Sequence, residues 1–308
     1  MTLPGEFVLR RSADVPVDTL VRLVRAYEEG STGTATWTRE DVLLAISHPH
    51  YEDNSWCLTG PGDELLGWGS LAPSGGPAVD AALTVLPGRR GAAAARFLVL
   101  HLLDRTDALA VTHGTSYGVD VGGILGGDTV LPRVLEETGF VRGATITQYD
   151  VDLSHEAPAG VLPRDAHIRP AVTADDTDAM HGLHLRSLAR GSKIHDPAVF
   201  HGRIRRLREL SGFALLMEIA GHPAGHVLAQ AASGQGRVLE AAVAPASRGL
   251  GVGLALVAAA LGELRRRGCA HALIAVDTAQ LIDPEGLRRD LGVQGERAMT
   301  HYHRDPET

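Results

Sequence analysis

The chain of 308 residues has a formal net charge of −8, with 44% hydrophobic and 21% charged residues. Its length exceeds that of a usual single domain and its composition is that of a soluble globular protein, so we expect two domains, each with its own core. The charge is spread without a basic block, and the longest apolar run, residues 250–262, is too short to cross a bilayer. We therefore expect neither a nucleic-acid partner nor a membrane segment.

The N-terminal residues and the cysteines narrow the class of protein further. The segment MTLPGEFVLRRSADVP lacks a basic region followed by a long apolar core, so we expect no secretion signal and a cytoplasmic protein. The two cysteines, Cys57 and Cys269, lie in different halves of the chain. They predict neither a disulfide framework nor a metal site.

An internal repeat relates the two halves. LTVLPGRRGAAAARFLVLHLL, from Leu83, aligns with AAVAPASRGLGVGLALVAAAL, from Ala241, at an offset of 158 residues. Further on, GFVRGATITQYD aligns with GVQGERAMTHYH at an offset of 153, which places Tyr149 on Tyr302. Two matches at nearly the same offset indicate a tandem duplication. We predict domains at 1–153 and 154–308, with the proline-containing residues 154–167 as the linker.

The elements of the second half are the clearest, and we expect the first half to repeat their order. HIRPA, from His167, predicts a short strand, and ADDTDAMHGLHLRSLA predicts a helix with an acidic first turn. A second helix is expected near 198–210. FALLMEIA and GHVLAQAAS predict two strands around the turn AGHPAG, and RVLEAAVAP predicts a third strand that ends at Pro245.

The remaining elements follow a glycine-rich loop. Leu254, Val257, Leu261 and Leu264 recur at helical spacing, which predicts an amphipathic helix. HALIAVD then predicts a buried strand, PEGLRRDLG a short helix and RAMTHYHR a closing strand. Strands and helices mixed in this order favour an α+β fold around one sheet in each half.

The loop itself, within EAAVAPASRGLGVG at residues 240–253, has the character of an anion site. Backbone N–H groups gather where a strand leads into a helix, and the helix dipole favours negative charge there. Gly249, Gly251 and Gly253 would let a pyrophosphate approach the backbone, and Arg248 can add a charged contact. The G-K-[ST] of a nucleotide P-loop and the βαβ context of a dinucleotide fold are both missing, which excludes those two sites.

The pattern Val-x-Pro-x-x-Arg-Gly-x-Gly-x-Gly, residues 243–253, resembles the acetyl-CoA-binding motif of the GNAT superfamily of N-acetyltransferases. The resemblance implies two tandem GNAT-like domains, each a mixed, mainly antiparallel sheet flanked by helices, in a layout similar to that of mycothiol synthase. It also implies an acyl-CoA in a cleft where two central strands splay. The implied contacts are Arg248, Gly249, Leu250, Gly251, Val252, Gly253 and Leu254 for the pyrophosphate, and Ala241, Ala242 and Val243 for the pantetheine.

The first copy of the loop differs from the second. Ala93 and Ala95 stand where the second copy has Gly251 and Gly253. We expect each methyl group to project toward the phosphate position, and alanine disfavours the positive φ that glycine tolerates. The first domain is therefore expected to have kept the fold and to have lost, or weakened, acyl-CoA binding.

Acyl transfer needs a base, an oxyanion donor and a way to discharge the thiolate. Glu240, on the strand that borders the cleft, is the candidate base, and partial burial would raise its pKa toward the useful range. A carboxylate on the solvent face of a strand is the alternative. The aligned residue in the first copy is Ala82, while His226 and Glu218 are weaker candidates. The resemblance suggests that the N–H of Val243 points at the thioester oxygen.

One feature of the resembled family is missing. Its usual general acid is a tyrosine in the stretch Asn-x-x-Ala-x-x-Leu-Tyr-x-x-Leu-Gly-Phe, and Arg288 of LRRDLGV stands at that position. Tyr302 on the closing strand is a candidate replacement, although a strand tyrosine is also a common core residue. A thiol with a pKa of about 8.5 can also leave without a strong acid.

The sequence thus predicts acetyl transfer from acetyl-CoA to an amine of a small molecule, by direct transfer in the C-terminal domain of a monomer or homodimer. The alternatives are a non-catalytic CoA-binding or ligand-sensing protein, which the missing tyrosine favours, and a structural protein with an empty loop. Four arginines in the predicted second helix either attract an anionic acceptor, such as a carboxylate-bearing amine, or form a solvated face. They are Arg203, Arg205, Arg206 and Arg208.

Overall fold

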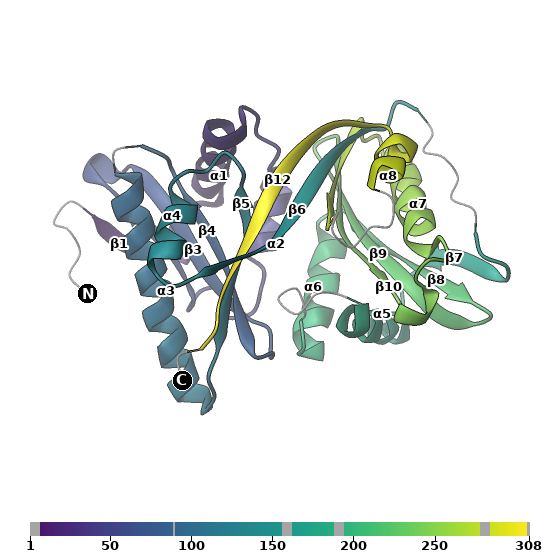
Figure 1. Cartoon of the computed structure of the whole chain (residues 1–308), viewed down its shortest axis with the longest axis horizontal. Coiled ribbons are helices and arrows are strands. Elements are labelled where there is room, and N and C mark those ends of the chain that lie inside the picture. Colours follow the sequence, from purple (N-terminus) through teal and green to yellow (C-terminus); the bar gives the residue numbers. More distant parts are fainter. Residues whose placement is uncertain (1–6, 89, 156–161, 188–193, 278–283, 307–308) are drawn as a thin grey trace. The chain divides into compact units, whose positions relative to one another are not determined.

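The computed structural model describes residues 7–88, 90–155, 162–187, 194–277 and 284–306, which fall into two compact units (Figure 1). Unit 1 contains Met1–Thr145 and Ala298–Thr308, and unit 2 contains Ile146–Arg297. The units follow the predicted halves except at the closing segments. The division at 153/154 into two domains that fold independently stays a prediction.

Unit 1 is a mixed, mainly antiparallel sheet in the order β1-β2-β3-β4-β5-β12-β6. β4 and β5 run parallel, and β1 to β4 pair antiparallel in sequence order. The elements are β1 (Val8–Arg11), α1 (Val17–Thr32), α2 (Arg39–Ala45), β2 (Ser55–Thr59), β3 (Leu65–Pro73), β4 (Ala78–Val85), α3 (Gly91–His113), β5 (Gly118–Leu125), α4 (Leu131–Glu137), β6 (Val141–Asp152) and β12 (Val293–Arg304).

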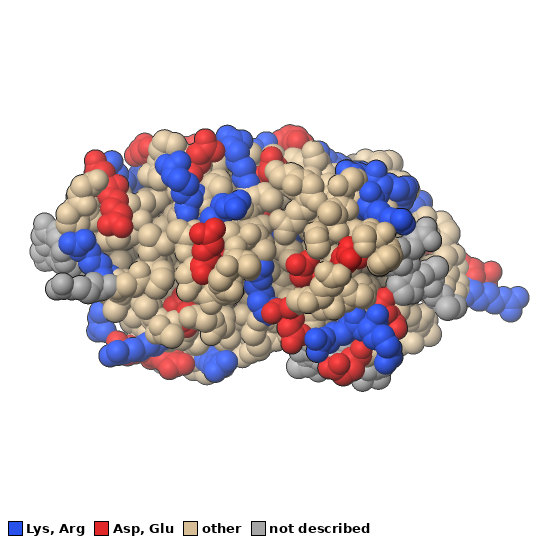
Figure 2. Space-filling view, turned by 90° about the horizontal axis from the view of Figure 1, so that it is seen from above, with Lys and Arg blue, Asp and Glu red and all other residues tan. Residues whose placement is uncertain are grey.

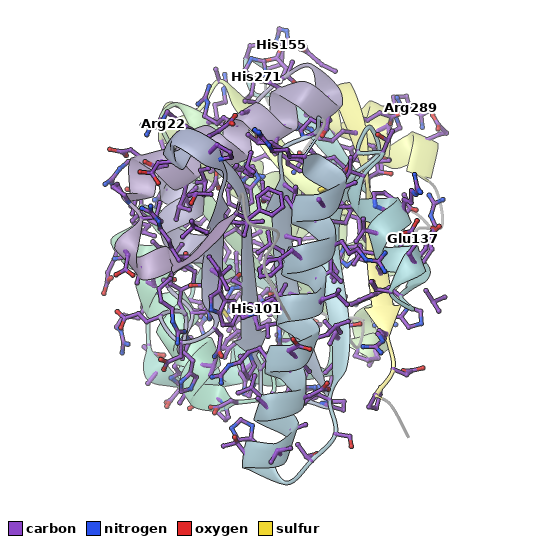
Figure 3. The ribbon with its side chains drawn as sticks, turned by 90° about the vertical axis from the view of Figure 1, so that its left-hand side faces the viewer. Arg22, His101, Glu137, His155, His271 and Arg289 are labelled. Atoms are coloured by element: carbon purple, nitrogen blue, oxygen red, sulfur yellow. The ribbon has the colours of Figure 1, made fainter. Side chains whose placement is uncertain are left out.

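Helices cover both faces of the unit 1 sheet. The long helix α3 packs on one face, and Figure 3 shows it lying across the strands with His101 labelled on it. On the other face, α1 and α2 enclose a second apolar cluster with the buried side chain of Trp68. Trp68 and Leu71 of β3, three residues apart, lie in the two different clusters, as the period of two in a strand requires.

Unit 2 repeats this architecture in the order β6-β11-β10-β9-β8-β7. β10 and β11 run parallel, while β7 to β10 pair antiparallel. The predicted strands and helices are present with shifts of a few residues, and β9 begins inside the predicted turn. The elements are β7 (Ala166–Pro170), α5 (Ala174–Ser187), α6 (Pro197–Glu209), β8 (Gly212–Ile219), β9 (His222–Ala232), β10 (Gln235–Val243), α7 (Val252–Arg266), β11 (His271–Val276) and α8 (Pro284–Leu291).

The helices of unit 2 also take opposite faces of their sheet. α7 buries Val252, Leu256, Leu261 and Leu264 against one face, and the predicted core residue Leu254 is only partly buried. α5 lies on the other face, where its His184 reaches β10. Asp196 caps α6 by accepting the N–H of Ala198, and a proline at the first helical position favours the start of this helix.

Equivalent contacts in the two units support the duplication. Gly67 of β3 has no room for a Cβ, because that atom would lie 2.8 Å from Leu98 Cδ1 on α3. At an offset of 158 residues, a Cβ on Gly225 of β9 would lie 2.9 Å from Leu256 Cδ1 on α7. Both glycines thus let the central helix approach the sheet at the same place.

Part of the last strand of each half pairs with the sheet of the other unit. The C-terminal part of β12 pairs antiparallel with β5 of unit 1, with Tyr302 opposite Val121, and in unit 1 it lies between β5 and β6 (Figure 1). The second part of β6, from the first half, pairs antiparallel with β11 of unit 2, with Tyr149 opposite Ile274. Each unit is therefore completed by a segment from the other copy.

The surface matches the composition. On the face drawn in Figure 2, basic and acidic side chains lie interspersed. In the described part of the chain, no helix is long and apolar enough to cross a membrane.

Candidate functional site in unit 2

The two parallel strands at the centre of unit 2 pair along only part of their length. Gln235 to Val238 of β10 pair with His271 to Ile274 of β11, and the pairs between these strands end there. β10 continues to Val243 beside β9 alone. Ala244 donates its N–H to Ala224 on the β9 side. Because successive N–H groups of a strand alternate in direction, the N–H of Val243 points to the opposite side, toward the gap between β10 and β11, which we call the splay.

The glycine-rich loop links this free strand edge to α7. Gly249 and Gly251 have φ of +78° and +79°, a left-handed conformation that glycine adopts without a steric penalty. Gly251 is the N-cap of α7, and no side chain in the described part of the protein caps this helix, so the N–H groups of its first turn keep their capacity to bind an anion. Arg248 is exposed and donates to the carbonyl of Ser187, 3.2 Å away.

The corresponding loop of unit 1 has a different shape. α3 begins at Gly91, which aligns with Gly249, so this helix starts three residues earlier than α7. The predicted reason for weak phosphate binding is wrong for Ala95, because its methyl group is fully buried in the core and does not face a phosphate. The loop differs because residue 93 continues a helix where Gly251 turns the chain.

The splay of unit 1 is also partly filled. Gly126 donates to Ala298 of β12, so the N–H of Leu125 points to the other side of β5, toward β4. This N–H lies 3.4 Å from the hydroxyl of Tyr27, which in turn donates to Asp128 at 2.9 Å. A buried side chain of α1 thus satisfies this N–H on the β5 side of the gap between β4 and β5 in unit 1.

Glu240 lies at the centre of a buried polar cluster on the α5 face of β10. Its side chain is 4% exposed. Oε1 accepts hydrogen bonds from His184 Nδ1 and His226 Nε2, both at 2.8 Å, and Oε2 accepts from Arg203 at 3.1 Å. Neither histidine side chain is exposed. Three donors from α5, β9 and α6 therefore hold one carboxylate.

These donors decide the pKa of Glu240. Burial alone raises it, as the sequence led us to expect, but the hydrogen bonds from His184 and His226 and the charge of Arg203 outweigh burial and hold the pKa well below its ordinary value. The expected upward shift is therefore wrong. The carboxylate is ionised at neutral pH and is a weak base.

Comparison with known proteins matches this geometry. The family model described as acetyltransferase (GNAT) family matches residues 178–282, from α5 to beyond β11. A curated mycothiol acetyltransferase from Thermobispora bispora is 30% identical over 251 residues, covering 78% of this chain and 80% of that protein. The chain belongs to the GNAT family of acetyltransferases.

Solved GNAT structures show the same fold along the whole chain. A GCN5-related N-acetyltransferase from Sphaerobacter thermophilus is similar with a TM-score of 0.77 at 21% identity, covering 99% of this chain and 97% of that one. A tandem GNAT protein from the clavulanic acid biosynthesis pathway is similar with a TM-score of 0.64 at 17% identity, covering 98% and 99%. The predicted fold class, two tandem GNAT-like domains with mixed sheets, is confirmed.

The other candidate residues lie apart from the Glu240 cluster. Glu218 of β8 pairs with Arg169 at 2.7 Å and with His167 at 3.0 Å. Arg288, at the family's tyrosine position, lies 3.5 Å from Glu296 and 3.6 Å from Glu285. Tyr302 is buried in the core of unit 1, where burial raises the pKa of its hydroxyl. Its role as a proton donor gains no support from this location and stays a prediction.

Sequence reasoning missed two members of the cluster. The sequence places His184 only within a predicted helix, and it links Arg203 to an acceptor and not to Glu240. His184 lies 56 residues before Glu240, a separation at which no local pattern signals a contact. Although two imidazoles meet a carboxylate here, the described residues contain no group of three His, Cys, Asp or Glu side chains suited to hold a metal ion.

Proposed function

We propose that unit 2 transfers an acetyl group from acetyl-CoA to an amine of a small molecule by direct transfer. One observation carries the proposal. The free edge of β10 at Val243 leads through a loop of left-handed glycines to the uncapped first turn of α7, within the region that matches the family model. This sequence of groups fits a ligand with an amide-bearing arm and a pyrophosphate.

Each residue of the site has a proposed task. Arg248 to Leu254 bind the pyrophosphate, and Ala241, Ala242 and Val243 offer the strand edge to the pantetheine. The N–H of Val243 stabilises the oxyanion that forms as the amine attacks. Acetyl-CoA supplies the activated acyl group. Glu240 provides fixed negative charge within the buried cluster on the α5 face of β10.

Calorimetry with acetyl-CoA tests the binding half of the proposal. We expect one acetyl-CoA per chain, and we expect Gly251→Glu to abolish binding, because the new side chain is strained at positive φ and brings negative charge to the phosphate site. Gly262→Glu on the same helix is the matched control, since a Cβ there meets nothing within 4 Å. Two equivalent sites would contradict the assignment to unit 2 alone.

A screen of amines for release of CoA thiol tests the transfer half. The acceptor of mycothiol acetyltransferase is the first amine to include, because the curated relative carries that name. The expected result is thiol release with at least one amine, and with none once acetyl-CoA binding is removed.

A ligand-sensing protein without turnover is the second candidate function. The ion pairs of Arg288 with Glu285 and Glu296, at the position of the family's general acid, favour it. Tight binding of acetyl-CoA with no thiol release across the whole amine panel would support this candidate over acetyl transfer.

A further inference from the structure

The Glu240 cluster can be examined atom by atom for a place that can receive a proton. Arg203 is permanently protonated and can only donate. Glu240 Oε1 already accepts two N–H groups, from His184 and His226. Three sites remain. Two are the ring nitrogens that point away from the carboxylate, one on each histidine. The third is Glu240 Oε2, which accepts from Arg203.

His184 has no site left. Its Nε2 accepts the backbone N–H of Ile194 at 2.7 Å, so this nitrogen carries no hydrogen, and its Nδ1–H donates to Glu240. A proton on Nε2 would oppose the N–H of Ile194. His181, one turn earlier, donates to the carbonyl of Ile194 at 2.9 Å, so two histidines hold the backbone of this residue. His184 is therefore locked as a neutral ring.

His226 is open. Its Nε2–H donates to Glu240, while its Nδ1 is buried and has no hydrogen-bond partner in the described part of the chain. A buried polar atom without a partner calls for an explanation, and a catalytic role is one of those that a folded protein offers. A proton on this nitrogen would form an imidazolium beside the Glu240 carboxylate, whose negative charge favours the added proton and is shared with Arg203.

Strand register gives His226, on the β9 side of β10, a smaller offset from Val243 along the strand direction than Glu240 has. His226 lies opposite Ala242, one residue before Val243, whose N–H faces the splay. Glu240 is three residues before Val243, about 10 Å along a strand at roughly 3.3 Å per residue. His226 thus lies about one residue step from the proposed oxyanion donor along the strand direction.

We propose that His226 Nδ1 accepts the proton that the acceptor amine loses, and that Glu240 is the positioning residue that orients the ring and balances its charge. The inference rests on the proposed function of unit 2. A carboxylate that orients a histidine base plays the same part in hydrolase triads.

The proton and the electrons balance in this step. The neutral amine nitrogen forms a bond to the thioester carbonyl carbon, and its proton passes to His226 Nδ1. The C–S bond breaks, and its electron pair leaves with the CoA thiolate. The imidazolium then gives the proton to the thiolate, directly or through water, which restores the neutral ring. In the described part of the chain, His226 contacts the charged Glu240 of β10 and, through Glu240, Arg203 of α6.

Nuclear magnetic resonance of the histidine rings tests the proton site without turnover. In the full-length protein with ¹⁵N-labelled histidine, we expect His226 to carry its proton on Nε2 and to leave Nδ1 free to accept one at neutral pH. His184 should carry its proton on Nδ1, because its Nε2 accepts the N–H of Ile194. A His226 that carries its proton on Nδ1 at neutral pH overturns the proposal.

Kinetics test the catalytic role. His226→Gln keeps an N–H near the position of Nε2 but removes the titrating nitrogen, so kcat/KM should fall by about 10²- to 10⁴-fold and the acidic limb of its pH profile should disappear. Glu240→Gln should keep the limb and move it to lower pH, because an imidazolium loses its counter-charge. A merely structural role of His226 would lower kcat without removing the limb.

Two histidine variants serve as controls. His184→Asn keeps a donor to Glu240 and should lower the rate while retaining the acidic limb. His101→Gln, in unit 1, changes another ring whose Nε2 has no hydrogen-bond partner among the residues that the structure describes, and should leave the profile unchanged (Figure 3). If His226→Gln retains the limb and loses less than tenfold, the proposal is wrong. If no amine releases thiol, the proposed function fails, while the resonance experiment still decides the proton site.

Discussion

Tyr149 and Tyr302, which align in the sequence repeat, are each buried in the unit built mainly from the other copy. Tyr149 lies opposite Ile274 in the core of unit 2, and Tyr302 lies opposite Val121 in the core of unit 1. The C-terminal residues 298–308 therefore support the fold of unit 1, and their loss is expected to act on a sheet that begins almost 300 residues earlier.

Tyr302→Ala should destabilise unit 1 by about 3–5 kcal/mol, the usual cost of removing a buried aromatic ring. Urea unfolding followed by a tryptophan signal can measure this, because all three tryptophans, Trp37, Trp56 and Trp68, lie in unit 1. Tyr302→Phe keeps the ring and separates the two roles of the residue. A loss of kcat in this variant at full stability would establish Tyr302 as the proton donor, against its placement in unit 1.

The exchange of closing strands was beyond sequence reasoning. The period-two patterns around Tyr149 and Tyr302 are equivalent, so each strand suits either sheet, and a local pattern cannot state which partner it takes. By contrast, the loop and helix at Gly251 to Leu264 were predicted well, because glycines in a turn and apolar residues at helical spacing can be recognised directly in the sequence. The residues that line the splay were also named from the sequence.

The glycines of the loop should differ in their tolerance of alanine. Gly251→Ala forces a Cβ into the left-handed region and should cost about 1–2 kcal/mol, together with a loss of acetyl-CoA affinity. Gly253 is the matched control, because it is helical and a Cβ there would lie 3.5 Å from Val243 Cγ2, an ordinary contact. Gly253→Ala should raise stability by up to about 1 kcal/mol. Thermal unfolding and calorimetry measure the two effects, and an equal response of both positions would contradict the assigned loop geometry.

Glu240 should make the stability of the protein pH-dependent. Its pKa is lower in the folded chain than its ordinary value of 4.5, so its contribution is fully present above that value and is lost as the pH falls through the folded pKa. Glu240→Gln should cost about 1–3 kcal/mol at pH 7, and the difference from the natural protein should shrink below about pH 4. Urea midpoints between pH 3 and 7 measure this. Glu209→Gln, an exposed partner of Arg206, should change stability by less than about 0.5 kcal/mol at every pH.

The direction of that pKa shift shows why the chemistry of the cluster could not be predicted. Burial of Glu240 follows from its place on an inner strand, and burial alone raises a carboxyl pKa. The opposite outcome depends on His184, His226 and Arg203, which approach from three other elements. Their contacts exist only in the folded sheet.

Arg203 should favour acceptors that carry a negative charge. Its side chain is 28% exposed and donates one N–H to Glu240 Oε2, so the other N–H groups of its guanidinium can meet an anionic group on the acceptor. Arg203→Met should therefore raise KM more for a carboxylate-bearing amine than for the corresponding amide, by about tenfold. Arg205→Met, an exposed arginine two residues along α6, is the control and should change both KM values little. Steady-state thiol release with the paired acceptors measures the ratio. An equal rise for both acceptors would show that Arg203 acts only through Glu240 and that α6 contributes no charge selection.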